Sequence, residues 1–329
     1  MALTIQREDL TVLEPEWRQL LHGVPLRCAF VHPVWLRSWW QEFGAGRELI
    51  LLTARHDGAL AAVAPLMRQD SRLTFAGDTQ VCDYMDVIAP ADNRAALLAA
   101  VLRSLSEEPW TEIVLWALPE DSPTLAALPA VCRDLNLVFQ QELEDVCPRL
   151  HLPASVDEYF EGLDKKDRHE LRRKLRKLPQ GGEISLERIE DPDGITGAMD
   201  DFLRMHTASR AEKAAFMTAP MERFFRRVVP SLAAEGMAEM VFLRLGGTRV
   251  AALLTFRTED ELHLYNSGYD PAYAGLSVGL LSKALALESA IERGYKIFDF
   301  LRGPEPYKYD LGARDLRVYR CVIRRTEEA

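Results

Sequence analysis

The sequence has few cysteines, and none of them are arranged to cross-link a fold or hold a metal. The five cysteines, Cys28, Cys82, Cys132, Cys147 and Cys321, lie too far apart for a C-x-x-C pair. An odd, scattered set indicates reduced thiols rather than a disulfide framework. The seven histidines form no H-x-x-x-H pair, so the sequence predicts no metal site.

Long hydrophobic runs are also missing. The N-terminus becomes charged at Arg7 and lacks the apolar core of a signal peptide. The longest uncharged apolar runs, such as 59–67, are shorter than the roughly 20 residues that a membrane-spanning helix needs. We therefore expect no membrane span and a cytoplasmic location.

An excess of positive charge is absent too. The formal net charge of the 329 residues is -10, which argues against non-specific binding along nucleic acid but allows a local basic site. The sequence contains no G-x-S-x-G motif and no P-loop of the NTPase type. With 48% hydrophobic residues, the chain can bury a substantial core.

What the sequence does contain is an alternation of helix and strand patterns in two halves. The first half predicts helices at 33–43, 92–106 and 123–135 and strands at 48–55, 59–68, 73–76, 84–88, 111–116 and 137–147. After an expected crossover at 148–153, the second half predicts helices at 155–163, 164–178, 193–212, 220–235 and 275–293 and strands at 183–189, 238–245, 249–258, 261–269, 296–300 and 316–324. Hairpin turns are expected at Asp57-Gly58 and Gly246-Gly247. The fold class is therefore α/β (α+β), with two halves of similar structural order.

The start of the helix at 275–293 is one candidate binding element. It follows a strand and a turn, and it contains Gly275, Leu276, Ser277, Val278 and Gly279. Exposed backbone N–H groups and the helix dipole suit a phosphate or pyrophosphate there. A simple N-cap at Ser277 with loop glycines fits the same residues, so spacing alone leaves both interpretations open.

A second candidate is the polar loop after the strand at 296–300. It holds Asp299, Arg302, Glu305, Tyr307 and Lys308. A carboxylate at the end of a strand can accept a proton from an attacking amine or alcohol. A lysine can stabilise the charge that develops on a carbonyl oxygen. A loop held together by internal ion pairs would have the same composition.

A third candidate is the basic helix, whose residues 164–177 contain eight Lys or Arg and three Asp or Glu. Arg168 and Arg172 are expected to bind an anionic group if this helix is a docking face, although such helices are often only solvated surfaces. Further candidates are His206 and Arg210, one helical turn apart. Asp83 and Tyr84 could line a cleft in the first half, but ordinary packing explains both pairs as well.

The stretch from Tyr265 to Lys308, and above all FDFLRGPEPYKY (298–309), resembles the CelD-like acyltransferases. That group is a branch of the GNAT superfamily close to the FemAB-like peptidyltransferases. HPVWLRSWWQEFG (32–44), DRHELRRKLRKL (167–178) and FLRMHTASR (202–210) fit the same family. The resemblance implies tandem GNAT-like domains, each a mixed, mostly antiparallel sheet flanked by helices. The first would cover 1–150, completed by a returning C-terminal strand at 316–329, and the second would be the acyltransferase domain at 151–315.

The resemblance also implies acyl-CoA, with acetyl-CoA as the expected form, as a co-substrate and no metal. The pyrophosphate would bind at 275–279, and the thioester would lie along the strand near Tyr265. The loop before the glycines carries Tyr273-Ala274, where the family has more arginine or glutamine. Direct attack by the acceptor is expected, without a covalent enzyme intermediate. The implied roles are Asp299 as base, Lys308 with backbone N–H groups at the oxyanion, and Tyr265 or Tyr307 as the proton donor to the thiolate.

The acceptor is expected to be an amine or hydroxyl of a small molecule, a glycan or a peptide. The residues expected to contact it are Arg168, Arg172, His206, Arg210, Arg302, Asp83 and Tyr84. Two other functions fit the sequence. One is a FemAB-like transferase that takes an aminoacyl group from tRNA, which the basic helix would meet. The other is a non-catalytic scaffold in polysaccharide assembly.

Overall fold

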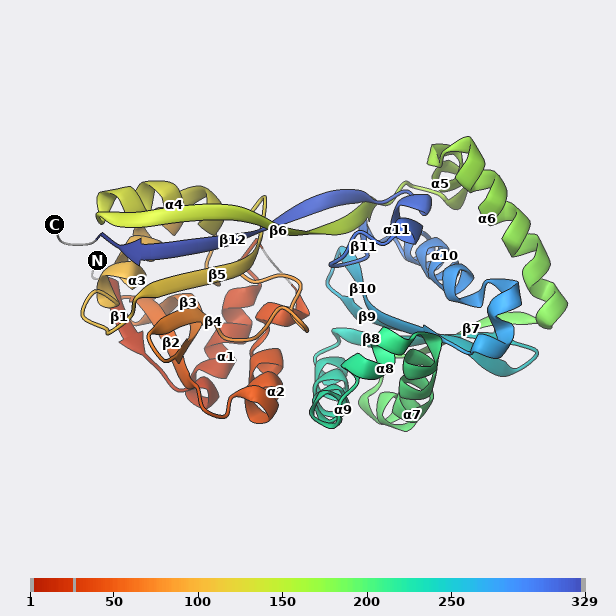
Figure 1. Ribbon diagram of the computed structural model, residues 1–329, viewed down its shortest axis with the longest axis horizontal. Coiled ribbons are helices and arrows are strands. Elements are labelled where there is room, and N and C mark those ends of the chain that lie inside the picture. Colours follow the sequence, from red (N-terminus) through yellow and green to blue (C-terminus); the bar gives the residue numbers. More distant parts are fainter. Residues whose placement is uncertain (1–2, 26–27, 327–329) are drawn as a thin grey trace. The chain divides into compact units, whose positions relative to one another are not determined.

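The computed structural model describes residues 3–25 and 28–326 (Figure 1). The chain divides into two compact units, one formed by residues 1–146 and 316–329 and the other by residues 147–315. Each unit is a sheet flanked by helices. Residues 327–329 of the predicted C-terminal strand lie outside the described residues.

The first unit has the strand order β1-β2-β3-β4-β5-β12-β6. Its neighbours pair in antiparallel fashion at β1–β2, β2–β3, β3–β4 and β5–β12, whereas β4 and β5 are parallel. The strands are β1 Leu3–Arg7, β2 Glu48–His56, β3 Ala59–Gln69, β4 Arg72–Phe75, β5 Glu112–Pro119, β6 Leu137–His151 and β12 Arg314–Arg325. The helices are α1 Leu10–Leu21, α2 Pro33–Phe43, α3 Arg94–Ser104 and α4 Pro123–Asp134, with a 3-10 turn, η1, at Ala29–Val31.

The second unit has the order β6-β11-β10-β9-β8-β7, in which only β10 and β11 are parallel. The strands are β7 Ile184–Ile189, β8 Ala238–Leu245, β9 Thr248–Arg257, β10 Glu261–Tyr269 and β11 Ile297–Asp299. The helices are α5 Val156–Gly162, α6 Lys165–Lys177, α7 Pro192–Ser209, α8 Ala211–Phe216, α9 Ala219–Ala234, α10 Val278–Glu292 and α11 Pro306–Asp310. Two 3-10 turns, η2 Leu178–Gly181 and η3 Pro271–Leu276, precede β7 and α10.

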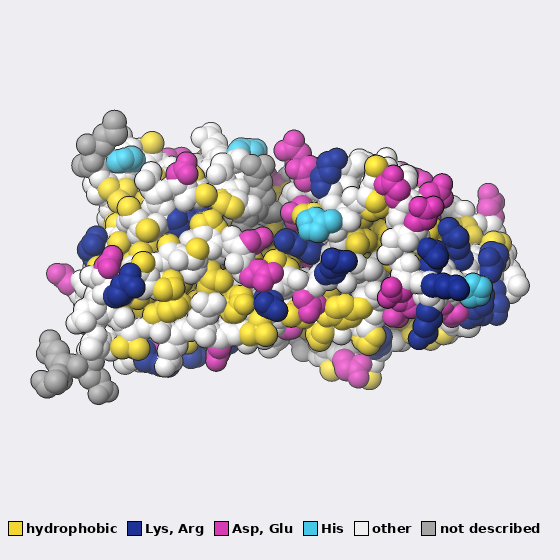
Figure 2. Space-filling model, turned by 90° about the horizontal axis from the view of Figure 1, so that it is seen from above, with side chains coloured by type: hydrophobic (Ala, Val, Ile, Leu, Met, Phe, Trp, Pro, Cys, Tyr) yellow, Lys and Arg dark blue, Asp and Glu magenta, His cyan; other side chains and the backbone are white. Residues whose placement is uncertain are grey.

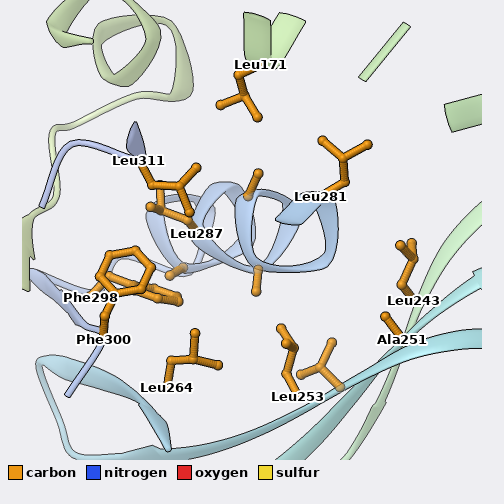
Figure 3. Close-up of a cluster of buried hydrophobic side chains, with 14 of the residues drawn as sticks. Leu171, Leu243, Ala251, Leu253, Leu264, Leu281, Leu287, Phe298, Phe300 and Leu311 are labelled. Atoms are coloured by element: carbon orange, nitrogen blue, oxygen red, sulfur yellow. The ribbon is translucent and has the colours of Figure 1, made fainter. Parts of the chain in front are cut away.

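The core of the second unit is built around α10 (Figure 3). Leu281 and Leu287 of this helix are fully buried, and Leu264 of β10 and Phe298 of β11 belong to the same cluster. Leu171 of α6 lies on the far side of α10 from Leu264 (Figure 3). Since burying each large side chain contributes about 1.5–3 kcal/mol, α10 is fixed firmly on one face of the sheet. Helices α7 and α9 cover the opposite face (Figure 1).

Two sequence predictions of local structure are wrong. Residues 84–88 form no strand, because the segment is buried throughout and its backbone bonds to two different elements. The N–H of Met85 donates to the carbonyl of Ala117, and Ile88 makes a single isolated bridge with Val63. Residues 148–153 do not form a separate connecting segment, although the chain does pass from the first unit to the second next to them, between Val146 and Cys147. Strand β6 runs through this boundary to His151 and pairs there with β11.

Three differences concern helices. The predicted helix at 193–212 is interrupted at Arg210, which is extended with φ -158°, so that a separate α8 begins at Ala211. The predicted helix at 275–293 begins only at Val278, after the 3-10 turn η3. Helix α1, capped by the Asp9 carboxylate, was not predicted. Among the described residues, no helix combines the length and hydropathy needed to cross a bilayer.

Candidate functional site

The neighbouring strands β10 and β11 separate partway along their length. In the described chain their pairing covers only three registers, the last of which joins His263 to Asp299. Strand β10 continues to Tyr269, whereas β11 ends at Asp299. The register between β10 and β9 shifts between Leu264 and Asn266, and such a bulge bends and twists a strand. The edge of β10 beyond His263, where β11 no longer pairs with it, is therefore available to a ligand.

A pocket of about 250 Å³ includes this part of β10. Its walls come from β10, from the start of α10, from the α7–α8 junction and from the loop that leads into α11. The lining residues are Ser209, Arg210, Lys213, Ser267, Tyr269, Ala274, Ser277, Val278, Gly279, Leu280, Lys283, Glu305 and Tyr307. All of them belong to the second unit.

The start of α10 forms one wall without a side-chain cap. Ser277 occupies the N-cap position in a left-handed conformation, φ 56°, and makes no capping hydrogen bond. The first N–H groups of any helix have no intrahelical acceptor, so those of α10 are oriented to bind an anion. Gly279 packs closely on Tyr269, since a Cβ atom there would lie 2.8 Å from a ring carbon. This glycine is therefore required for the approach of α10 to β10.

Three basic side chains line the pocket: Arg210, Lys213 and Lys283. The Nζ atom of Lys283 donates to the carbonyl of Gly279 at 2.6 Å and lies 5.0 Å from the centre of the Tyr307 ring. Burial, together with the charges of Lys213 and Arg210, lowers the pKa of Lys283 to about 7. The Nζ atom of Lys213 donates to the carbonyl of Ser267, and burial lowers the pKa of this lysine to about 8. Both lysines were missed by the sequence reasoning, although Lys283 is the one charged residue within the apolar run at 278–287.

Tyr307 is the predicted catalytic residue that lines this pocket. Burial raises the pKa of its hydroxyl, and the neighbouring Glu305 carboxylate raises it further. Lys308, next in the chain, is 2% exposed and is engaged by its own loop. Its Nζ donates to the carbonyls of Leu301, Arg302 and Gly303 at 2.8, 2.9 and 2.9 Å and lies 2.8 Å from Glu305.

The other predicted catalytic residues lie outside the lining of the pocket. Asp299 is 1% exposed, and its Oδ1 accepts the N–H of Leu301 at 2.6 Å. Leu301 itself is left-handed, with φ 58°. Tyr265 is directed toward α9, where its ring packs against Phe225 at 5.8 Å between centroids. Of the predicted donor-binding residues, Ser277, Val278 and Gly279 line the pocket, whereas Gly275 and Leu276 belong to η3.

Among the predicted acceptor residues, Arg210 lines the pocket and the others do not. The Nε2 atom of His206 lies 2.9 Å from the Asn266 Oδ1, and burial lowers the pKa of this histidine to about 4, so it is neutral. The remaining predicted residues are spread over the two units. Arg168 donates to the Glu161 carbonyl, and Arg172 lies over the Phe160 ring. Arg302 lies in the loop before α11. Asp83 and Tyr84 belong to the first unit.

A strand that diverges beside an uncapped helix start, with basic side chains and a protonated tyrosine, can bind an anionic thioester and protonate its leaving group. Residues 165–309 match the family model described as Acetyltransferase (GNAT) domain. This part of the second unit is therefore similar to a GNAT-type acetyltransferase domain, and the two α/β units have the predicted fold class. Among proteins with a curated function, none matches the chain in sequence.

Several solved structures share this fold over almost the whole chain. FemX has a TM-score of 0.66 at 12% identity and covers 96% of this chain and 96% of its own. L-PGS from Bacillus licheniformis has a TM-score of 0.60 at 12% identity, covering 95% of this chain and 91% of its own. A tandem GNAT protein from the clavulanic acid biosynthesis pathway has a TM-score of 0.52 at 12% identity, covering 99% and 100%. In the described residues no cluster of three His, Cys, Asp or Glu side chains could hold a metal ion.

Proposed function

We propose that the second unit transfers an acyl group, in the simplest case acetyl, from acyl-CoA to an amine or hydroxyl acceptor by direct attack. The acceptor would be a small molecule or a component of the cell envelope or of a polysaccharide. The single observation that carries this proposal is the pocket where β10 leaves β11 beside the uncapped start of α10.

The charge of the pocket supports a donor that carries phosphate. The loop residues Tyr273 and Ala274 supply no positive charge ahead of α10. The positive charge comes from Arg210 between α7 and α8, from Lys213 of α8 and from Lys283 of α10. A diphosphate could therefore bind the N–H groups at the start of α10 with these cations beside it. The pantetheine part of acyl-CoA would then lie along β10 beyond His263, where β11 no longer pairs with it.

The chemistry follows from this placement. The acceptor nitrogen or oxygen attacks the thioester carbonyl and loses a proton, with Asp299 proposed as the base through water. Backbone N–H groups stabilise the oxyanion, and Lys308 could join them if one of its loop contacts opened. The carbon–sulfur bond then breaks. Tyr307 is the proposed donor of the proton that the thiolate takes up, because its raised pKa keeps the hydroxyl protonated at neutral pH.

The basic face of α6 favours a second candidate, an aminoacyl-tRNA-dependent transferase of the FemAB type. Lys and Arg side chains gather over the end of the second unit that α6 forms (Figure 2). Arg172 and Arg176 on this helix are exposed. Binding of tRNA through such residues would weaken steeply with salt, whereas binding of acyl-CoA in the pocket would change much less.

The test is a thermal-shift and calorimetric panel of acetyl-CoA, longer acyl-CoAs and aminoacyl-tRNA. A ligand of the native state stabilises it by RT ln(1 + [L]/Kd). We expect acetyl-CoA to raise the unfolding temperature, and we expect Lys213→Met and Lys283→Met each to weaken its binding by about 10-fold. Lys296→Met, an exposed lysine outside the pocket, is the matched control and should bind like the wild type.

The other outcomes separate the competing functions. Stabilisation by aminoacyl-tRNA alone, with a steep salt dependence, would favour the FemAB-type transferase. No stabilisation by any ligand of the panel would contradict the proposal and favour a scaffold. Equal binding by the two pocket variants and the wild type would remove this pocket as the donor site.

A further inference from the structure

A second pocket, of about 270 Å³, lies in the second unit and shares no lining residue with the first. It is formed by the end of β6, by α5 and by the segment between α11 and β12. Its lining residues are Arg149, Leu150, His151, Pro153, Glu158, Tyr159, Gly162, Leu163, Gly312 and Arg314. Nothing in the proposed acyl transfer uses this pocket.

The inner wall of this pocket is apolar. Tyr159 and Leu163 are 3% and 7% exposed, and Leu150 packs partly buried against the same core. The hydroxyl of Tyr159 donates to the carbonyl of Leu311 at 3.2 Å, so its polar atom is already satisfied. Gly312 has φ +92°, and a Cβ atom there would lie 3.0 Å from a Leu163 methyl group. The glycine therefore keeps the hollow from being filled by the chain itself.

The rim of the pocket is basic. Its lining includes Arg149, Arg314 and His151 with one carboxylate, that of Glu158, and Arg149 and His151 also interact electrostatically with the carboxylate of Glu261 outside the lining. The Glu158 carboxylate is already engaged at the start of α5, where Oε2 accepts the N–H of Ala154 at 3.1 Å. The ligand that complements an apolar hollow with a basic rim is amphipathic, with an apolar body and an anionic head.

The volume limits the size of that ligand. A pocket of about 270 Å³ equals roughly nine water molecules of liquid volume, which is room for an unbranched chain of about eight to ten carbon atoms. We propose that this pocket binds a medium-chain fatty carboxylate. Its chain would pack on Leu150, Tyr159 and Leu163, and its carboxylate would face His151 and Arg314.

The position of this pocket relates it to α11. Gly312 and Arg314 lie just beyond the end of α11, whose Tyr307 lines the donor pocket. The N–H of Leu311 donates to the Tyr307 carbonyl at 3.1 Å, and the N–H of Gly312 donates to the Tyr309 carbonyl at 2.8 Å. An occupant would therefore contact the residues that end the helix. Binding of a ligand in this second pocket does not require the proposed acyl transfer.

The test is isothermal titration of the full chain with decanoate. Gly162 lines the pocket, and a Cβ atom there would meet nothing within 4 Å, so Gly162→Phe should fill the hollow without disturbing the fold. Gly197 of α7 is also exposed and equally open, which makes Gly197→Phe the matched control. We expect decanoate to bind the wild type and Gly197→Phe and to lose at least 10-fold in affinity for Gly162→Phe, with all three proteins melting normally.

Further measurements test whether the ligand must carry a carboxylate. Arg314→Gln should weaken decanoate by about 5-fold, while decanol and acetate should bind far more weakly than decanoate to the wild type. No binding of decanoate, equal binding by Gly162→Phe, or decanol binding as tightly as decanoate would overturn the proposal. A concentration-dependent dimer that Gly162→Phe dissolves would instead assign the pocket to a second copy of the chain.

Discussion

Asp299 and Lys308 hold the two backbone polar groups of the same residue, Leu301. The Asp299 carboxylate accepts the Leu301 N–H at 2.6 Å, and the Lys308 ammonium donates to the Leu301 carbonyl at 2.8 Å. Leu301 has φ 58°, a conformation that costs a non-glycine residue of order 1–3 kcal/mol and persists only where the surroundings enforce it. The two charged residues therefore maintain the bend that leads from β11 into the loop before Tyr307.

Their shared contact leads to a kinetic prediction. Asp299→Asn and Lys308→Met should each lower kcat by about 100-fold or more, because each is proposed to act on the reacting groups. Because both also hold Leu301, the double variant should lose less than the product of the single losses. The measurement is a double-mutant cycle in kcat, with Lys296→Met as the control. Wild-type rates in both single variants would contradict the proposed roles.

Tyr307→Phe should separate binding from chemistry. Removing the hydroxyl takes away the proposed proton donor and leaves the ring that Lys283 contacts. We expect kcat to fall by about 100-fold, with the Kd for acetyl-CoA nearly unchanged. In pre-steady-state measurements, the loss of rate in Tyr307→Phe should be smaller for thioesters of lower thiol pKa, since a better leaving group needs less protonation. An equal loss for all thioesters would mean that Tyr307 only shapes the pocket.

Lys283 gives the unliganded protein a pH-dependent stability. Its pKa is about 7 in the folded chain against a usual 10.5, so between these values the unfolded state binds more protons and stability rises with pH. The slope approaches about 1.4 kcal/mol per pH unit for one such group. Lys283→Met should therefore melt at a higher temperature than the wild type near pH 6, and the difference should shrink toward pH 9. A constant difference at all pH values would contradict the lowered pKa.

Gly268 should tolerate no side chain. A Cβ atom there would lie 2.3 Å from the backbone nitrogen of His206, so helix α7 would have to move away from strand β10 to accommodate it. We expect Gly268→Ala to destabilise the fold by about 1–3 kcal/mol or more. Gly275→Ala, where a Cβ atom meets nothing within 4 Å, is the control. Urea unfolding measures both, and equal midpoints would show that α7 can retreat from β10.

Much of the fold could be predicted because local sequence determines it. The helix at 33–43 and the strand at 261–269 have the predicted bounds, since proline at a helix start and strand periodicity are local signals. Residues 84–88 were mispredicted because a segment buried on every side has no alternation, and its backbone partners come from distant elements. Helix α1 was missed although it is as amphipathic as α2, because Pro15 lies inside it and an internal proline usually ends a helix.

The candidate site could be predicted only in part. Ser277, Val278, Gly279 and Tyr307 come together in the pocket, and the sequence already marked them as a helix start and a polar loop. The position of Lys213 in the pocket could not be predicted, since it depends on the interruption of the helix at Arg210. This interruption directs α8 toward Ser267. The contacts of Asp299 and Lys308 with Leu301 depend on the left-handed backbone of Leu301, which could not be predicted because leucine rarely adopts a positive φ.

The lone lysine in the apolar helix α10 has one more consequence. If the phosphates of a donor come to rest beside Lys283, their charge favours the protonated amine, so its affinity for hydrogen ions rises when the donor arrives. Donor association would then draw hydrogen ions from the buffer near neutral pH. The heat of association would differ between phosphate and Tris buffers, whose ionisation enthalpies differ, and that difference would count the hydrogen ions gained.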